Sequence, residues 1–295
     1  MATQSAPVYG PSALGGSIRR FFELTLTLAR TEFKLRYFGS ALGYLWSLIR
    51  PLLFFGVLYF VFTVIFQIGK GVPHYGVYLL TGIVLWSYLA EATSGCVQCL
   101  VQREALLRKV RFPRMVIPLS VSLTSLFNLG MNFIAVLVFA LANGLSPRIE
   151  WLELIPIVFF FVLLATGLGM ILSVLYVRFR DIQPIWDVFV QAWFYLSPVM
   201  YPVSKYAVLA TKYHISGQTA THLAMLNPPA VLLTQMGYAL IGPTTGPDGT
   251  TSWQDAAYYA GSGFRVLIPL AIIVVIFLVG WWVFTREAPR VAENL

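Results

Sequence analysis

The sequence predicts an all-α integral membrane protein with six transmembrane helices, and three observations support this. Apolar residues make up 58% of the 295 positions and charged residues only 11%, against about 25% charged in a soluble domain. Six apolar stretches each approach the roughly 20 residues needed to cross the hydrocarbon. The basic residues lie beside these stretches rather than along a polar face, so the net charge of +8 indicates membrane orientation. We expect no nucleic-acid partner.

The N-terminal region predicts a tail followed by an amphipathic helix. Residues 1–16 are rich in Ala, Ser, Pro and Gly and predict a disordered tail with no cleaved signal peptide. From Ile18 to Tyr37 a broad apolar stripe recurs at helical spacing. It predicts a helix on the cytoplasmic membrane surface, with basic residues toward anionic headgroups. The alternative is a soluble helix packed on the protein itself. The stripe consists of Ile18, Phe22, Leu26, Ala29, Phe33 and Tyr37.

Six spans are predicted, and Pro198 is expected to kink the fifth of them. Their limits are 45–68, 75–100, 115–143, 154–177, 185–203 and 266–285. The apolar run after Asn227-Pro228 ends at Ile241 and is too short to span, so the segment 227–241 predicts a short re-entrant or interfacial helix. Fifteen of the 20 Lys and Arg residues then fall on one side. The positive-inside rule places both termini on that side, in the cytoplasm.

The cytoplasmic segment 102–114 is short, charged and helix-favouring until Pro113 stops it. Glu104 and Arg108 have the i, i+4 spacing of a helical ion pair. The apolar side chains of this segment are exposed unless something covers them, and Arg103 is expected to be a rim charge. Two interpretations remain open from these residues alone: a docking surface for a partner, or a loop that rests on the lipid headgroups.

No catalytic, cofactor-binding or metal site is predicted in this chain. Cys96 and Cys99 form a single C-x-x-C pair within an apolar stretch, without a second pair or a βαβ pattern. The histidines have no ligand spacing. The Gly69-Lys70 pair does not fit a nucleotide-binding loop, so any energy for transport must come from elsewhere.

Three further patterns bear on helix packing or on a transport path. Glu91 is the one carboxylate well inside a predicted span and is a candidate for a polar pathway, although a single carboxylate is weak evidence for a proton relay. The small residues Ala165, Gly169 and Ser173 recur every four positions and predict close helix packing. Aromatic rings near the spans favour ordinary packing or interfacial belts, with sugar stacking as the alternative. The candidate glycan-channel aromatics are Trp86, Tyr88, Trp193 and Tyr195.

Five motifs carry a resemblance to a known family. The stretch Glu32-Phe-Lys-Leu-Arg-Tyr-Phe-Gly-Ser-Ala-Leu-Gly-Tyr-Leu-Trp-Ser-Leu-Ile-Arg-Pro51 resembles the start of the first span in type-2 ABC exporter permeases of the polysaccharide and polyol-phosphate branch. Matching motifs follow in the expected order, and the resemblance covers nearly the whole chain. They are Phe112-Pro113, Arg178-Phe-Arg-Asp181-Ile182, Ser197-Pro-Val-Met-Tyr-Pro202 and then Asn227-Pro228.

The resemblance implies that residues 17–295 form a type-2 ABC transporter transmembrane domain. Such a permease is a homodimer in the bacterial inner or plasma membrane, with two separate ATPase subunits that bind ATP and Mg. It exports a lipid-linked glycan such as O antigen, teichoic acid, capsule or galactan. The family's interface helix corresponds to 18–38, with Phe22, Phe33, Lys34 and Arg36 as its candidate residues. The coupling helix corresponds to 102–114, with Arg103, Glu104, Leu106, Leu107, Arg108, Val110 and Phe112.

Three other functions remain as alternatives. A small-molecule or drug exporter has the same architecture, although the match from Glu32 to Pro51 favours glycan export. A membrane-embedded glycosyltransferase would need a carboxylate pair at the membrane face, and the sequence contains no Asp-x-Asp. A passive channel is disfavoured because no ring-forming polar stripe is recognisable in a span. The glycan and its lipid carrier are not identified by the sequence.

Overall fold

The computed structural model describes residues 18–37, 43, 45–67, 72–104, 113–212, 214, 216–243 and 253–294. Within these ranges the regular structure is helical and contains no strand. The predicted N-terminal tail and residues 244–252 lie outside them. Five helical segments are long and apolar enough to cross a membrane, and they correspond to the first four and the last of the predicted spans. These are Leu45–Ile65, Tyr75–Val97, Val116–Ala142, Ile149–Arg178 and Gly263–Glu287.

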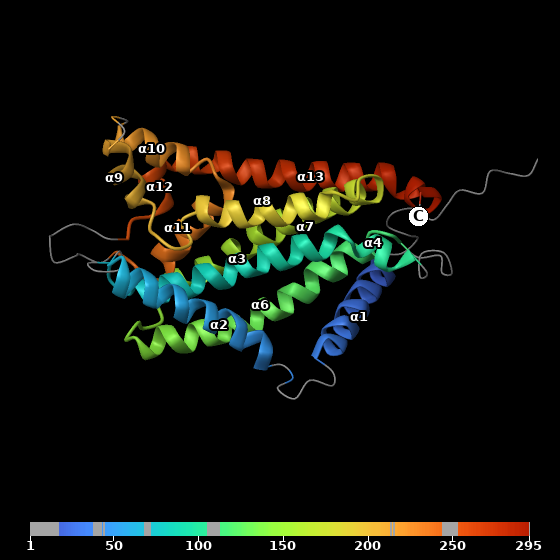
Figure 1. Ribbon diagram of the computed structural model, residues 1–295, viewed down its shortest axis with the longest axis horizontal. Helices are drawn as coiled ribbons and strands as arrows, with labels where there is room; N and C mark the ends of the chain where they lie inside the picture. Colours follow the sequence, from blue (N-terminus) through green and yellow to red (C-terminus); the bar gives the residue numbers. More distant parts are fainter. Residues whose placement is uncertain are drawn as a thin grey trace, which may run out of the picture.

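The long helices are α1 (Ile18–Tyr37), α2 (Leu45–Phe60, continued by a π-helix at Val61–Ile65), α3 (Tyr75–Val97), α6 (Val116–Ala142), α7 (Leu154–Arg178, preceded by a 3₁₀ turn at Ile149–Glu153) and α13 (Gly263–Asn294). The shorter ones are α4 (Cys99–Gln102), α8 (Ile182–Leu196), α9 (Ser204–Lys212), α10 (Gly217–Ala224), α11 (Pro228–Ile241) and α12 (Ala256–Ala260). Figure 1 shows α1, α4 and the C-terminal part of α13 at one end of the bundle and α9 to α12 at the other.

The fifth predicted span, 185–203, is not one continuous helix. Helix α8 has only 15 residues and ends at Leu196, so it is not among the five long segments. Ser197 is extended, with φ −99° and ψ 149°. Its conformation follows from Pro198, because a proline ring disfavours the helical conformation of the residue before it. Pro198 therefore ends the helix rather than kinking it.

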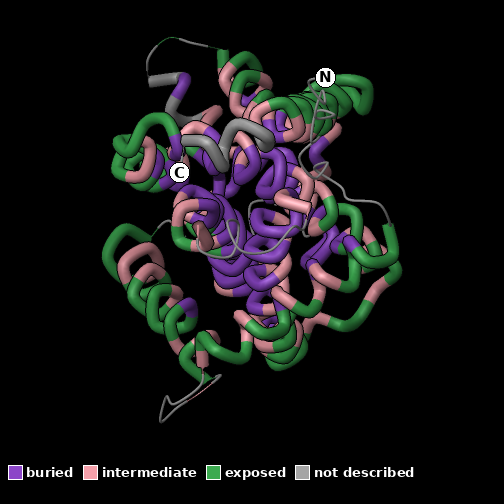
Figure 2. Tube along the Cα trace, turned by 90° about the vertical axis from the view of Figure 1, so that its right-hand side faces the viewer, coloured by how far each residue is buried: buried purple, intermediate pink, exposed green. Residues whose placement is uncertain are grey.

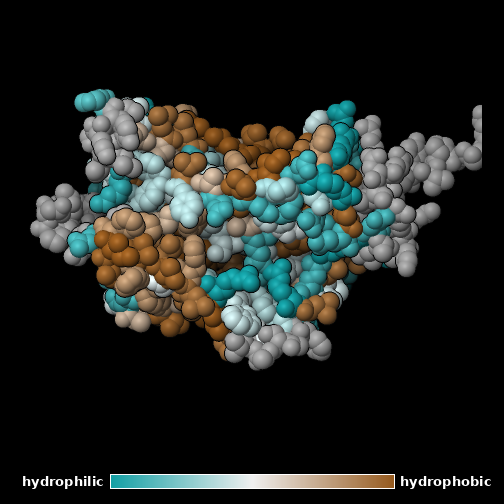
Figure 3. Space-filling model, in the orientation of Figure 1, coloured by the Kyte–Doolittle hydropathy of each residue, from teal (hydrophilic) through white to brown (hydrophobic). Residues whose placement is uncertain are grey.

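Helices α3 and α7 form the centre of the bundle, which is the buried core of Figure 2. In the most apolar window of α3, 78% of residues are buried, against 6% in α2 and 17% in α13. Figure 3 shows hydrophobic side chains over α2 and along α13. An apolar surface on this scale needs lipid or another apolar partner rather than water.

Helices α7 and α13 approach each other through two glycines. A Cβ atom on Gly280 would lie 2.3 Å from the carbonyl oxygen of Gly167, and one on Gly167 would lie 2.7 Å from the Cα of Phe277. The predicted small-residue face of α7 packs on α3 instead, since a Cβ on Gly169 would lie 2.8 Å from the Sγ of Cys96. Ala165 and Ser173 on the same face are fully buried. Small residues therefore bring α7 close to two neighbours at once.

Helix α1 packs on α6 with only part of the predicted stripe. Ala29, Phe33 and Tyr37 of that stripe contact α6. The buried residues of α1 are Phe21, Thr25 and Ala29, whereas Phe22 is 65% exposed. Small side chains at the contact allow Thr124 Oγ1 of α6 to donate a hydrogen bond of 3.3 Å to the carbonyl of Ala29. Close backbone approach is therefore possible at Thr25 and Ala29, while Phe22 of the stripe is left outside the contact.

We expect Gly280→Ala to destabilise the bundle by roughly 1–3 kcal/mol, because the new methyl group meets backbone rather than a movable side chain. Gly56→Ala in α2 is the matched control, since a Cβ there meets nothing within 4 Å. Thermal unfolding of both purified variants in detergent measures the difference. Equal melting temperatures for the two variants would contradict the close α7–α13 packing.

Candidate functional site

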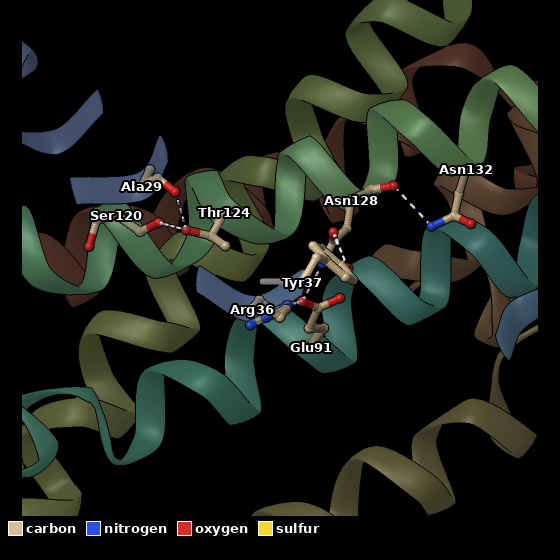
Figure 4. Close-up of polar contacts among 8 residues, drawn as sticks. All are labelled: Ala29, Arg36, Tyr37, Glu91, Ser120, Thr124, Asn128 and Asn132. Carbon is tan, nitrogen blue, oxygen red and sulfur yellow. Dashed lines mark hydrogen bonds and ion pairs between the residues drawn. The ribbon is translucent and has the colours of Figure 1, made fainter. Parts of the chain in front are cut away.

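A polar cluster joins the C-terminal end of α1 to α3 and α6 (Figure 4). Glu91 of α3 forms an ion pair with Arg36 of α1 and accepts a hydrogen bond of 2.8 Å from Nδ2 of Asn128 on α6. The hydroxyl of Tyr37 donates to Oδ1 of the same asparagine at 2.7 Å. The carboxylate that the sequence places inside a span is therefore paired, as an ionised group at that depth requires.

The asparagine belongs to a polar stripe along α6 that the sequence analysis missed. Ser120, Thr124, Asn128 and Asn132 recur every four residues and so lie on one helix face. Thr124 donates to the carbonyl of Ser120 at 2.8 Å, and Asn132 donates to the carbonyl of Asn128 at 2.9 Å. The four-residue repeat was the available signal. It places side-chain donors and acceptors opposite α1.

The candidate residues of the interface helix lie in three different environments. Arg36 takes part in the polar cluster. Phe33 packs its ring against Tyr37 and against Phe127 of α6, at centroid distances of 5.4 and 5.7 Å. Lys34 is exposed and lines a shallow apolar hollow between α1 and α6. Phe33 and Arg36 therefore contact the neighbouring helices. Phe22 and Lys34 lie on the outward side of α1.

A second ion pair connects α1 to the start of the predicted coupling segment. Arg103, directly after α4, pairs with Glu32 of α1, and their side chains are only 20% and 23% exposed. Burial raises the pKa of the Glu32 carboxyl above its ordinary value, and the positive charge of Arg103 offsets part of that effect. The prediction of Arg103 as a rim charge is therefore wrong. Its side chain is drawn into the protein by the carboxylate of α1.

Only part of the predicted coupling segment lies within the described residues. Glu104 is among the described residues and is half-buried. Leu106, Leu107, Arg108, Val110 and Phe112 lie outside the described residues. The assignment of these five to partner docking stays a prediction from the sequence.

The four candidate channel aromatics separate into two buried and two accessible rings. Trp86 is 5% exposed and Tyr88 is 2% exposed, so neither ring has a free face for a sugar. Tyr88 instead makes a 3.1 Å hydrogen bond with Ser122 of α6. Trp193 is half-buried and Tyr195 is 54% exposed, both on α8. Only this second pair remains available for a channel surface.

At the opposite end of the bundle, two of the sequence motifs contact each other. Asn227 accepts a 2.9 Å hydrogen bond from the indole of Trp193 and donates one of 3.0 Å to the hydroxyl of Ser197. Asn227 precedes Pro228 at the predicted start of α11, but its side chain makes no hydrogen bond to that helix. Tyr75 also fixes the segment between α8 and α9, because its hydroxyl donates a 2.6 Å hydrogen bond to the carbonyl of Met200. The network fixes α11 against the end of α8.

The segment after α11 contributes a packed indole. Trp253 is 4% exposed, lies 4.7 Å from the ring of Tyr78, and donates a 3.0 Å hydrogen bond to the carbonyl of Pro73. Gln235 of α11 accepts from the backbone N–H of Ala256 at 2.9 Å. Through these contacts the segment that leads into α12 packs on α3 and α11.

Comparison with known proteins agrees with this architecture. Residues 23–221 match the family described as ABC-2 type transporter. The O-antigen export system permease protein RfbA of Myxococcus xanthus is 34% identical over 214 residues, which cover 72% of this chain and 77% of that protein. The protein of the same name from Klebsiella pneumoniae is 31% identical over 185 residues, covering 61% of this chain and 69% of that protein.

A helical bundle with five long apolar segments, a packed surface helix and a polar cluster at one end defines a polytopic membrane protein. The match across two thirds of the chain identifies the class further. The chain belongs to the ABC-2 type transporter family.

We expect Glu91→Ala to loosen α1 from the bundle, because it removes the partner of Arg36 and the acceptor of Asn128. The ion pair is partly exposed, so the loss should be about 1 kcal/mol, or roughly fivefold faster amide hydrogen exchange over the C-terminal half of α1. Glu23→Ala is the control, since the Arg19–Glu23 pair is exposed on α1 itself. Equal exchange rates in both variants and the wild type would contradict this role of Glu91.

Proposed function

We propose that this chain is the permease subunit of an ATP-driven exporter that moves a lipid-linked polysaccharide from the cytoplasmic to the outer face of the cell membrane. The observation that carries this proposal is the identity of 34% with an O-antigen export permease over 72% of the chain. The alignment is supported by the motifs of the first span and by those at Ser197 and Asn227, which contact each other in the fold.

The proposed topology has six spans with both termini in the cytoplasm. Helix α8, together with the non-helical residues 197–203 that follow it, crosses as the fifth span, so the helix itself is shorter than a full span. Figure 1 supports the orientation, because α1, α4 and the C-terminal part of α13 lie at one end. The loops at that end carry most of the basic residues, as the positive-inside rule requires of the cytoplasmic side.

We propose that two copies of this chain form the transport path. Helix α2 is apolar but almost unburied, and α8 exposes a row of large side chains. A two-fold dimer that pairs these helices covers surfaces which one copy leaves open. Trp193 and Tyr195 lie on α8 and are placed to face a passing sugar chain. The exposed residues of α8 include Ile185, Val188, Phe189, Tyr195 and Leu196.

The energy comes from two copies of a separate ATPase subunit, which bind ATP and Mg. The chain itself has no nucleotide-binding loop. The segment 102–114 is proposed to dock the ATPase at the cytoplasmic end. Arg103 lies at the start of this segment and forms an ion pair with Glu32 of α1. A movement of the segment is therefore transmitted directly to α1.

The docking role predicts that Leu107→Glu abolishes co-purification of the ATPase and export of the polysaccharide. A carboxylate buried without a partner in an apolar interface costs several kcal/mol. Leu107→Met is the matched control, because it keeps an apolar side chain of similar volume. Leu107 lies outside every proposed span, so both variants should reach the membrane in equal amounts.

The measurements are recovery of the ATPase on the affinity-tagged permease and surface detection of the polysaccharide in cells that produce each variant. If Leu107→Glu assembles and exports as well as Leu107→Met, the ATPase docks elsewhere and the segment is a headgroup-facing loop.

A further inference from the structure

A cavity of about 800 Å³ lies beside the polar cluster, between the end of α1, the start of α2, and helices α3 and α6. Its volume is in the range of small-molecule binding sites. Figure 3 shows hydrophilic side chains gathered between α1 and α2 on this face, next to the hydrophobic surface of α2. The lining residues that the inference uses are Arg36, Trp46, Arg50, Glu91, Asn128 and Asn132.

The charges that line this cavity are unbalanced. Glu91 is already held by Arg36 and Asn128. Arg50 projects from α2 and has no hydrogen bond or ion pair with the described part of the chain. Two guanidinium groups and one carboxylate leave one net positive charge among the residues that line the cavity. A guanidinium in that position is suited to a phosphate, which it binds through paired, charge-assisted hydrogen bonds.

The depth of the cavity fits a phosphate that belongs to a membrane lipid. Arg50 lies five residues after Leu45, the first residue of α2, or about 8 Å along the helix. Glu91 lies six residues before Val97, the last residue of α3, or about 9 Å from that end. Both positions lie about halfway between the cytoplasmic end of their span and its middle. At this level a lipid keeps its chain in the hydrocarbon while its phosphate contacts Arg50.

The cavity also has groups suited to a sugar. Trp46 is 49% exposed and Phe54 is 45% exposed, and both lie on α2 at the rim. Exposed aromatic faces stack on the apolar face of a pyranose ring. The amides of Asn128 and Asn132 lie on the facing wall from α6. Phosphate contacts therefore adjoin aromatic and amide contacts in one space.

We propose that this cavity binds the phosphate or diphosphate ester that joins the lipid to the first sugar of the exported chain. Arg50 is the principal contact, Arg36 is the second, and Glu91 positions Arg36 while reducing the net charge. This inference rests on the proposed function for the identity of the glycan carrier. The binding of the phosphate ester is measurable without transport.

The test uses the full chain in nanodiscs of phosphatidylcholine and titrates farnesyl diphosphate, with farnesol as the ligand that lacks phosphate. We expect farnesyl diphosphate to bind and farnesol to bind far more weakly. Arg50→Gln should weaken binding about tenfold, because it removes a charge-assisted contact. Arg50→Lys should recover part of the loss. Glu91→Gln should strengthen binding, since it removes the competing anion but keeps an oxygen for Arg36 and Asn128.

Arg30→Gln is the matched control. It removes an exposed guanidinium from α1 that lines a separate hollow with Phe127 and Met131. Equal weakening by Arg30→Gln and Arg50→Gln would reduce the effect to general attraction between a basic surface and an anion, and would overturn the proposal.

Further ligands separate the sources of the phosphate. Inorganic pyrophosphate that binds as tightly as farnesyl diphosphate would overturn a role for the lipid ester. Phosphatidylglycerol that displaces farnesyl diphosphate at equal concentration would assign the cavity to bulk anionic lipid instead.

The inference and the proposed function fail in different ways. Absence of polysaccharide export by the wild-type complex refutes the proposed function. Normal export together with farnesyl diphosphate binding that is unaffected by Arg50→Gln refutes only the site.

Discussion

The structure depends on the constraint that a polar group surrounded by hydrocarbon must find its partner within the protein. Glu91 is the clearest case, since its charge is placed inside a span and is met by Arg36 from one helix and Asn128 from another. Neither partner is near it in sequence. The need to neutralise one carboxylate therefore determines where α1 lies against α3 and α6, and α6 supports the arrangement with a row of hydroxyl and amide groups.

The same constraint links α1 to the cytoplasmic segment proposed to dock the ATPase. Glu32 and Arg103 form a second pair one helical turn from Arg36, so α1 is held by charge at two neighbouring points. Helix α1 also packs on α6 through Thr25 and Ala29. A helix fixed in this way should transmit movement of the docking segment to α3 and α6 without sliding. The cavity that holds Arg50 lies directly beside that contact.

Length, hydropathy and charge were sufficient to predict most of the fold. The first four spans and the last agree with the helices to within a few residues, and α11 begins at the predicted Asn227-Pro228 pair. These features are local, since they depend on how many apolar residues follow one another. The fifth span was expected to be one kinked helix, because hydropathy does not register that Pro198 makes Ser197 extended and so ends α8 at Leu196.

Contacts between distant residues could not be read in the same way. The buried face of α1, the pairing of Arg103 and the burial of Trp86 each depend on which helix lies opposite. The most direct measurement is the distance between spin labels at Thr31→Cys on α1 and Gln102→Cys on α4, two exposed positions, in the complex with its ATPase. Both native cysteines are buried. A rigidly held α1 predicts the same distance distribution without nucleotide and with trapped ATP, whereas a distribution that shifts on ATP binding would contradict it.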